Sequence, residues 1–253
     1  MNRRLSHWLG ATVIALAAFT TKAGAQISAP QLKVLTSGGF AAPLKAALPA
    51  FEKGSGLSVT VILGKSQGAG PDTIAAQLDR GVAADVVILS REGLLDLIAQ
   101  KKVIASSATD LARTPLGMAV KAGAPKPDIG TVEAFKATLL RARSITYPSS
   151  TTGIWMSTKL FPQLGIAKEM AAKSTNANVA AVVAGDAELA IQPVSELLHV
   201  PGADFVGTLP AQIQYVSVFS AARTANGNSQ GKQLIDFLAS PAARGAMRDS
   251  GME

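Results

Sequence analysis

The chain alternates short apolar segments with amphipathic ones, and this alternation limits the folds open to it. In residues 33–56 a β-compatible run ends at the turn Thr36-Ser37-Gly38-Gly39, and apolar residues from Leu44 to Phe51 then recur at the spacing of one buried helix face. Pro43 fits the first turn of that helix, where a missing N–H costs little. A strand that turns into a helix through Ser-Gly-Gly leaves backbone N–H groups free at the positive end of the helix dipole. This unit therefore predicts either an anion site or an ordinary strand-to-helix turn.

Similar units follow along the whole chain. The apolar runs predict further strands at 57–63, 85–90, 116–120, 144–147, 189–192 and 214–220. Helical spacing predicts helices at 74–81, 93–101, 131–140, 179–184, 233–239 and 241–247. Strands that alternate with helices predict an α/β fold with a mostly parallel sheet, whose ligands bind at the carboxyl ends of the strands.

The first 25 residues have the pattern of a secretory signal peptide. Arg3 and Arg4 precede an apolar stretch at residues 8–19, and Ala23-Gly24-Ala25 has the small residues of a cleavage site. The apolar stretch is short for a membrane span, although an uncleaved anchor is the alternative interpretation. We expect export to the periplasm, with cleavage after Ala25.

Composition excludes several classes of protein. Cysteine is absent, so the fold cannot depend on disulfides, and a thiol nucleophile or cysteine metal site is excluded. His199 is the single histidine after residue 25, which argues against a metal site, and no phosphate loop or Gly-x-Ser-x-Gly elbow suggests a cofactor or a serine hydrolase. Removing the signal peptide leaves 21 basic against 17 acidic side chains. These charges are dispersed, so nucleic-acid binding is not expected.

Three turns after predicted strands carry candidate ligand-binding residues. Ser37 follows the first strand with Gly38 and Gly39, and its hydroxyl can contact an anion, cap the helix, or do both. Ser66 and Lys65 follow the second strand, where a plain turn serine and a solvated lysine are the alternatives to a contact with an anion. The third turn has more hydroxyls than helix capping needs, which predicts that one or two of them face a cleft: Ser149, Ser150, Thr151 and Thr152.

The segment after the strand at 189–192 adds further candidates. Gln192 and Ser195 follow a strand end and are placed to close a cleft over a ligand. Glu196 is either a first-turn helix acid, favourable at the positive dipole end, or a catalytic base. Asp85 opens a buried strand and is expected to be structural.

Taken in order, these segments resemble the periplasmic solute-binding proteins of ABC importers, specifically the molybdate-binding branch. The resemblance covers nearly all of the chain after the signal peptide. The segments that carry it are Ser37-Gly38-Gly39, Phe51-Glu52-Lys53-Gly54-Ser55-Gly56, the turn 64–70, Ala84-Asp85-Val86-Val87-Ile88, Leu111-Ala112-Arg113, the turn 147–153, residues 183–188 and Phe237-Leu238-Ala239-Ser240-Pro241.

The resemblance implies a two-lobed fold of the type II class, with a ligand cleft between two α/β lobes. It implies a first lobe at residues 26–115, a second lobe at 116–220, and C-terminal helices at 221–253 that return to the first lobe. It also implies a monomer that holds a small anion with serine hydroxyls and backbone N–H groups. By position, Ser37 and Ser66 match the contacts of one lobe, and the turn 149–152 matches those of the other.

Two departures from the molybdate-binding branch keep the ligand open. Those proteins usually have a tyrosine after the strand at 189–192 and alanines before the first serine, whereas this chain has Gln192-Pro193-Val194-Ser195-Glu196 and Ser-Gly-Gly. The first hypothesis is a solute-binding protein that delivers a molybdate-like oxyanion or a carboxylate to an ABC permease. The second is an isomerase of the aconitate isomerase kind, which uses the same scaffold, with Lys65, Glu196 or Arg91 as the available catalytic side chains. A third is a module that senses or presents a ligand.

Overall fold

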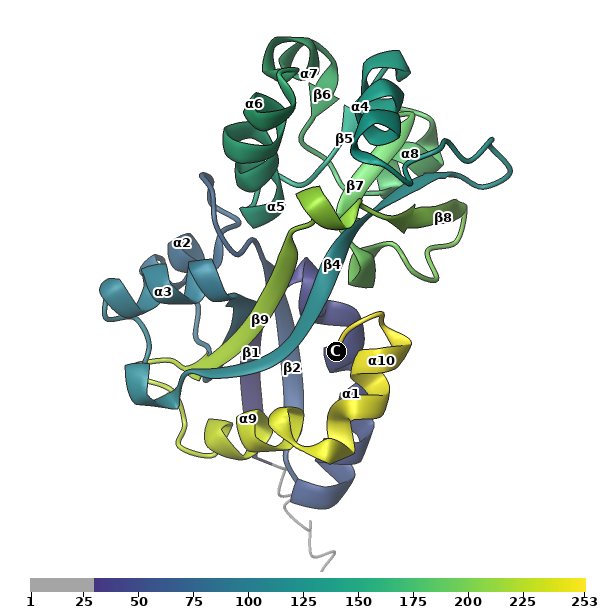
Figure 1. Cartoon of the computed structure of the whole chain (residues 1–253). Helices are drawn as coiled ribbons and strands as arrows, with labels where there is room; N and C mark the ends of the chain where they lie inside the picture. Colours follow the sequence, from purple (N-terminus) through teal and green to yellow (C-terminus); the bar gives the residue numbers. More distant parts are fainter. Residues whose placement is uncertain (1–29) are drawn as a thin grey trace, which may run out of the picture.

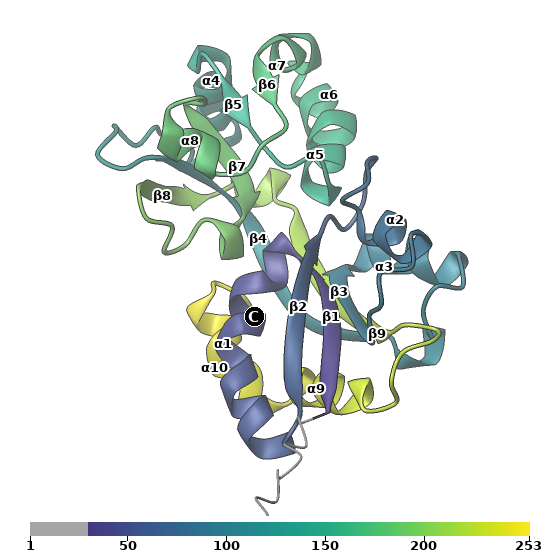
Figure 2. The same ribbon diagram turned by 180° about the vertical axis from the view of Figure 1, so that it is seen from behind.

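The computed structural model describes residues 30–253, and the predicted signal peptide and its cleavage site lie outside this range. The chain folds into two α/β lobes, one above the other in Figure 1, and Figure 2 shows them from behind. The predicted two-lobed α/β class is therefore confirmed. Within residues 30–253 no helix is long and apolar enough to cross a membrane.

Nine strands and ten α-helices make up the described part of the chain. The strands are β1 (Gln31–Ser37), β2 (Ser58–Gly64), β3 (Val86–Ser90), β4 (Thr109–Lys121), β5 (Ile145–Thr146), β6 (Ser174–Thr175), β7 (Leu189–Pro193), β8 (Ala203–Thr208) and β9 (Val216–Arg223). The helices are α1 (Gly38–Ser55), α2 (Ile74–Asp79), α3 (Arg91–Ala99), α4 (Val132–Arg141), α5 (Thr151–Trp155), α6 (Phe161–Leu164), α7 (Ala167–Lys173), α8 (Ala180–Ala184), α9 (Gly231–Ala239) and α10 (Arg244–Asp249).

The strands follow the order β2-β1-β3-β9-β4-β7-β5-β6, with β8 paired to β4. Neighbours are parallel in the β2-β1-β3 part and in the β7-β5-β6 part. β9 and β4 pair antiparallel with each other and with the strands on either side, so the nine-stranded sheet is mixed. We call the part built on β1, β2 and β3 the first lobe, and the part built on β5, β6 and β7 the second lobe. The long strand β4 runs from one to the other (Figure 1).

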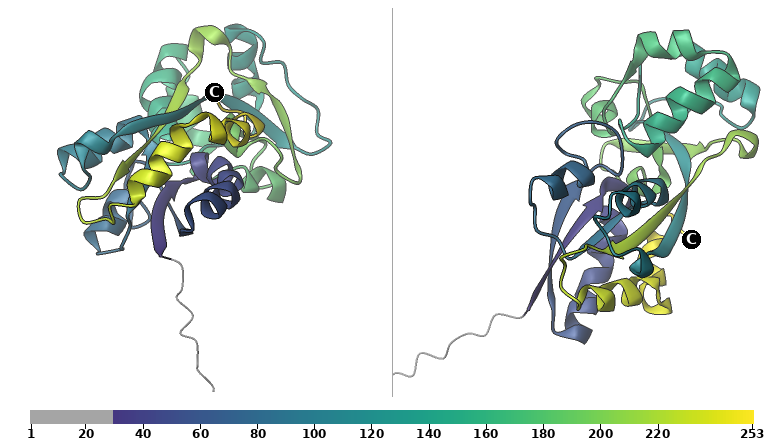
Figure 3. Two further views of the ribbon diagram at one scale, coloured as in Figure 1. Left: turned by 90° about the horizontal axis from the view of Figure 1, so that it is seen from below. Right: turned by 90° about the vertical axis from the view of Figure 1, so that its left-hand side faces the viewer.

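Each lobe has its own buried core because strand side chains alternate between two covered faces. In the first lobe, Val34 and Ile88 pack against α1, α9 and α10, whereas Leu35 and Val87 pack against α2 and α3. The second lobe has a separate core that includes Phe135 of α4. The C-terminal helices, yellow in Figure 3, lie beside the first lobe. The two cores are separate, and β4 and β9 connect the lobes. The carboxyl ends of the parallel strands therefore lie between the lobes.

Several element boundaries differ from the sequence prediction. α1 begins at Gly38, so Pro43 lies inside the helix and not in its first turn. The strand predicted at 116–120 is the second half of β4, which begins at Thr109. Thr151 and Thr152 belong to the first turn of α5. Four elements have no counterpart in the sequence prediction: β6, β8, α6 and α7.

Candidate functional site

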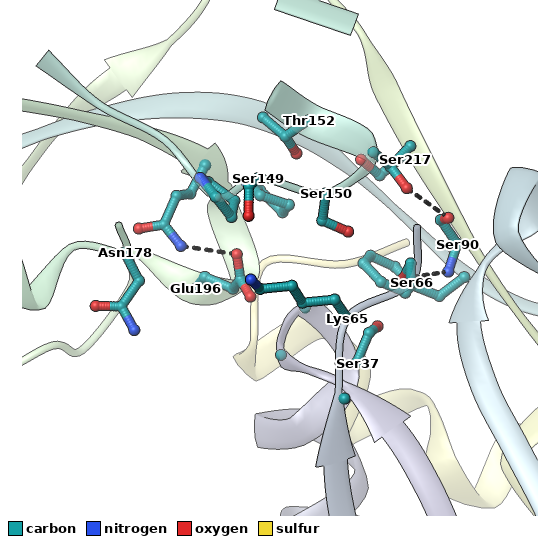
Figure 4. A pocket seen from close by; sticks show the side chains of 18 of the residues that line it. Ser37, Lys65, Ser66, Ser90, Ser149, Ser150, Thr152, Asn178, Glu196 and Ser217 are labelled. Carbon is teal, nitrogen blue, oxygen red and sulfur yellow. Dashed lines mark hydrogen bonds between the residues drawn. The ribbon is translucent and has the colours of Figure 1, made fainter. Parts of the chain in front are cut away.

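The candidate site is a cavity of about 320 Å³ between the two lobes. It lies at the carboxyl ends of parallel strands, where α/β sheets bind their ligands. The first lobe contributes the turns after β1, β2 and β3, and the second contributes the start of α5 and the segment after β7 (Figure 4). Hydroxyl groups dominate the lining, and Lys65 and Glu196 are its charged side chains.

Ser37 ends β1 and lies at the N-terminus of α1, facing the cavity. Its backbone has the extended conformation of an N-cap residue, yet its side chain makes no capping hydrogen bond. Its Oγ is buried and has no hydrogen-bond partner among the described residues. A buried hydroxyl without a partner costs free energy, so this Oγ is available to a ligand. Oε1 of Gln192, on the opposite side of the cavity, is buried and unpartnered in the same way.

The turn after β2 places Ser66 and Lys65 at the cavity. The backbone N–H of Ser90 donates to Oγ of Ser66 over 3.0 Å, which leaves the hydroxyl proton of Ser66 free to donate. Nζ of Lys65 lies 2.9 Å from Oδ2 of Asp72, and both side chains are partly exposed. Lys65 therefore supplies a positive charge at the cavity that Asp72 partly offsets.

Hydrogen bonds cross the cleft at one end of the cavity and connect the lobes. Oγ of Ser90 and Oγ1 of Thr151 are 2.8 Å apart, and the Thr151 hydroxyl lies 3.0 Å from Oε1 of Gln67. The Gln67 backbone N–H donates to Oγ of Ser150 over 3.3 Å. The second-lobe hydroxyls predicted to face a ligand thus also hold the two lobes together. Ser149 and Thr152 line the cavity beside them (Figure 4).

Glu196 brings a carboxyl group into this hydroxyl-lined cavity. It ends the short 3-10 turn Val194–Glu196, which follows β7, and Nε2 of Gln192 donates to its Oε2 over 2.8 Å. Burial raises the pKa of Glu196, and the Gln192 hydrogen bond opposes the shift without cancelling it. No hydrogen bond to Oε1 is formed within residues 30–253, so this oxygen is free to act on a ligand.

Nearly all of the predicted ligand-binding residues lie together. Those that line the cavity are Ser37, Gly38, Gly39, Lys65, Ser66, Ser149, Ser150, Thr151, Thr152 and Gln192. Ser195 does not line it, because its hydroxyl is buried and donates to the carbonyl of Gly39 over 2.8 Å. Arg91 also lies elsewhere and pairs with Asp110.

Four polar residues of the lining were not predicted from the sequence: Ser90, Asn176, Asn178 and Ser217. Ser90 ends β3, so the same strand-end rule that identified Ser37 would have found it. The two asparagines follow β6, a two-residue strand with no recognisable pattern. Ser217 lies within β9, where no local signal distinguishes a cavity position.

Within residues 30–253 no group of three or more histidine and acidic side chains is placed to hold a metal ion.

Comparison with known proteins shows the family of this chain. Residues 32–253 match the profile of a family described as bacterial extracellular solute-binding protein. An aconitate isomerase from Pseudomonas sp is 38% identical over 228 residues, which cover 88% of this chain and 87% of that protein.

Solved structures agree on the fold. The periplasmic molybdate-binding protein of Azotobacter vinelandii superposes with a TM-score of 0.71 at 20% identity, covering 88% of this chain and 98% of the other. Peb3 from Campylobacter jejuni superposes with a TM-score of 0.67 at 16% identity, covering 88% and 99%. A further structure shows PEB3 with L-phospholactate bound. At these identities the likeness concerns the fold alone.

Proposed function

This chain belongs to the family of bacterial extracellular solute-binding proteins, and from that premise we propose that it is an isomerase of aconitate or a closely similar unsaturated tricarboxylate. The observation that carries the proposal is the Glu196 carboxyl, which faces the hydroxyl-lined cavity between the lobes and has a raised pKa. A site that only holds an oxyanion is weakened by a carboxylate of the same sign. A site that must remove a proton from its ligand needs such a group.

The chemistry requires one proton transfer in each direction. In aconitate a methylene lies between a carboxylate and the carbon–carbon double bond, so loss of a methylene proton leaves a delocalised allylic anion. The Glu196 carboxylate takes that proton and returns it to the carbon at the other end of the allyl unit. The double bond then joins the central carbon to the carbon that lost its proton, and all three carboxylates stay in place. No oxidant or further reactant is consumed. A base whose pKa is raised toward the working pH is well suited to both steps.

The other cavity residues fit a ligand with several carboxylates. The free Ser37 and Ser66 hydroxyls are donors from the first lobe, and Ser149 and Thr152 are donors from the second. Hydrogen bonds to ionised carboxylates are among the stronger ones in proteins. Lys65 adds a positive charge near the developing negative charge of the allylic anion. The 38% identity to an aconitate isomerase supports the same assignment.

A second candidate is a solute-binding protein without catalysis, which captures a small oxyanion or carboxylate and delivers it to an ABC permease. The unpartnered Ser37 hydroxyl at the N-terminus of the 18-residue helix α1 favours it, because neutral donors alone can hold a dehydrated anion. For either function we propose a monomer in the periplasm, on the strength of the predicted signal peptide and the family.

The test combines turnover with binding on the purified chain from Gln26 onward. Proton NMR of a trans-aconitate solution should show cis-aconitate forming, with no change in a heat-denatured sample. A thermal-shift series with aconitate, citrate, molybdate, tungstate, sulfate and phosphate measures binding in parallel. Stabilisation by one of these anions without any interconversion of aconitate would overturn the isomerase and favour the binding protein.

A further inference from the structure

The glycine at position 38 leaves the space in which the Glu196 carboxyl lies, and a larger residue there would make this flexible side chain move. Gly38 is the first residue of α1, and a Cβ added there would overlap Oε1 of Glu196. The neighbouring Gly39 has a stricter constraint, since a Cβ there would overlap the buried ring of Phe219. Neither glycine has a positive φ, so the reason for glycine is space and not backbone conformation. The start of α1 is thus shaped around the Glu196 side chain.

A second contact fixes the turn that carries Glu196 to the same helix. In an α-helix the N–H of residue 43 would donate to the carbonyl of residue 39, but Pro43 has no N–H. The Gly39 carbonyl instead accepts the hydrogen bond from the Ser195 hydroxyl, which is buried. Ser195 precedes Glu196 in the turn after β7, and the two partners are 156 residues apart in the chain. Pro43 therefore frees the acceptor that anchors this turn.

We propose that Gly38, together with the Ser195–Gly39 hydrogen bond, positions the Glu196 carboxyl for proton transfer. The inference rests on the proposed isomerase function for its kinetic consequences. Gly38 provides the space for the carboxyl, and Ser195 with Pro43 fixes the backbone from which it projects. Gly38 and Ser195 are positioning residues, because they act through Glu196.

The surroundings of Glu196 determine how its pKa changes when Gly38 is substituted. Besides the ligand cavity, where Lys65 is the other charged side chain, Glu196 lines a surface cleft of about 730 Å³ whose lining includes the apolar Val183 and the titratable His199 and Asp249. Gly38 lines both the cavity and this cleft, and a methyl group at position 38 displaces the carboxyl from its buried position. Greater contact with water then lowers the pKa of Glu196 toward its ordinary value, because burial is the main cause of its shift.

The first experiment compares Gly38→Ala with Gly54→Ala, which lies in the same helix with open space around its added Cβ. Gly38→Ala should lower kcat for aconitate by about 10²-fold, since small misplacements of a catalytic group have effects of this size. Because Gly38 also lines the ligand cavity, KM can rise as well, but the fall in kcat should exceed that change, and Gly54→Ala should match the wild type. Glu196→Asp is shorter by one methylene, so Gly38→Ala should cost much less in a Glu196→Asp background. Equal effects of the two alanine substitutions, or equal costs of Gly38→Ala in both backgrounds, would overturn the proposal.

The second experiment separates positioning from stability. Ser195→Ala leaves the Gly39 carbonyl unpaired and should lower both Tm and kcat. Adding Pro43→Ala supplies an N–H that can bond this carbonyl within the helix, so Ser195→Ala/Pro43→Ala should recover Tm. The double variant still lacks the link to the turn of Glu196, and its kcat should stay low. Recovery of kcat together with Tm would show that Ser195 serves stability alone.

A third readout is independent of turnover. The carboxyl carbon of Glu196, identified in ¹³C NMR by its loss in Glu196→Gln, reports its pKa directly. Gly38→Ala and Ser195→Ala should lower this pKa, and Gly54→Ala should leave it unchanged. If the wild type does not interconvert aconitate but these shifts occur, the proposed function fails while the positioning of Glu196 stands. If the pKa is the same in all four proteins, the positioning proposal fails whatever the activity.

Discussion

Removing the Thr151 hydroxyl tests whether hydrogen bonds across the cleft keep the two lobes together. The Thr151→Val substitution preserves side-chain shape and eliminates two contacts with the first lobe, to Oγ of Ser90 at 2.8 Å and to Oε1 of Gln67 at 3.0 Å. Each such bond contributes a net of about 0.5–1.5 kcal/mol, so the closed form loses about 1–3 kcal/mol relative to an open one. That difference raises the open-to-closed ratio by about 5–150-fold.

Small-angle scattering of the ligand-free protein measures this shift as an increased radius of gyration. Citrate, if the thermal-shift series identifies it as a ligand, should restore the compact form and bind more weakly by up to the same factor. Thr158→Val is the matched control, because within the described part of the chain its exposed hydroxyl bonds only to the carbonyl of Ile154 in its own segment. An unchanged radius and unchanged citrate affinity for Thr151→Val would refute the reasoning that these bonds set the lobe equilibrium.

Three further predictions concern single cavity residues. Ser37→Ala should weaken tricarboxylate binding by roughly 1–3 kcal/mol in calorimetry but not lower Tm, because its buried Oγ has no hydrogen-bond partner to lose within residues 30–253. A fall in Tm with unchanged affinity would contradict this. Lys65→Ala should change Tm little, since its pair with Asp72 is partly exposed, and should reduce the salt dependence of binding. Glu196→Gln should raise Tm at neutral pH. Because the pKa of Glu196 is raised in the folded state, the wild type loses stability as pH rises above the ordinary value of 4.5, and below that pH the carboxyl costs nothing. The glutamine variant has no such loss. Equal Tm values for wild type and Glu196→Gln at every pH from 4 to 8 would contradict this prediction.

The general location of the cavity could be predicted from the sequence. Ser37 and Ser66 follow strands of one lobe and Ser149 follows a strand of the other, and carboxyl ends of parallel strands converge at one edge of a sheet. This strand-end rule needs only the positions of the strands, and apolar runs in the sequence indicate those positions. The same reasoning missed Ser217, because its place at the cavity depends on how β9 crosses between the lobes.

The helix start and the state of Glu196 depend on contacts that local patterns do not contain. Pro43 favours the first turn of a helix, yet it lies inside α1, because Ser195 satisfies the carbonyl that Pro43 leaves free. Glu196 has the pattern of an ordinary first-turn acid, and its raised pKa arises only from burial in the assembled cavity. A glycine such as Gly38 reveals its steric role only when its neighbour across the cleft is known.

The most direct measurement is the turnover of trans-aconitate, followed by proton NMR, for wild type, Glu196→Gln and Glu133→Gln. Glu133 is an exposed acid in the first turn of α4 and serves as the matched control. Wild type and Glu133→Gln should interconvert the isomers at the same rate. Glu196→Gln should lose about 10²–10⁴-fold in kcat, the range that general acid–base catalysis contributes, while calorimetry shows that it still binds the substrate. A Glu196→Gln protein that interconverts aconitate as fast as the wild type would contradict the central role assigned to this carboxyl.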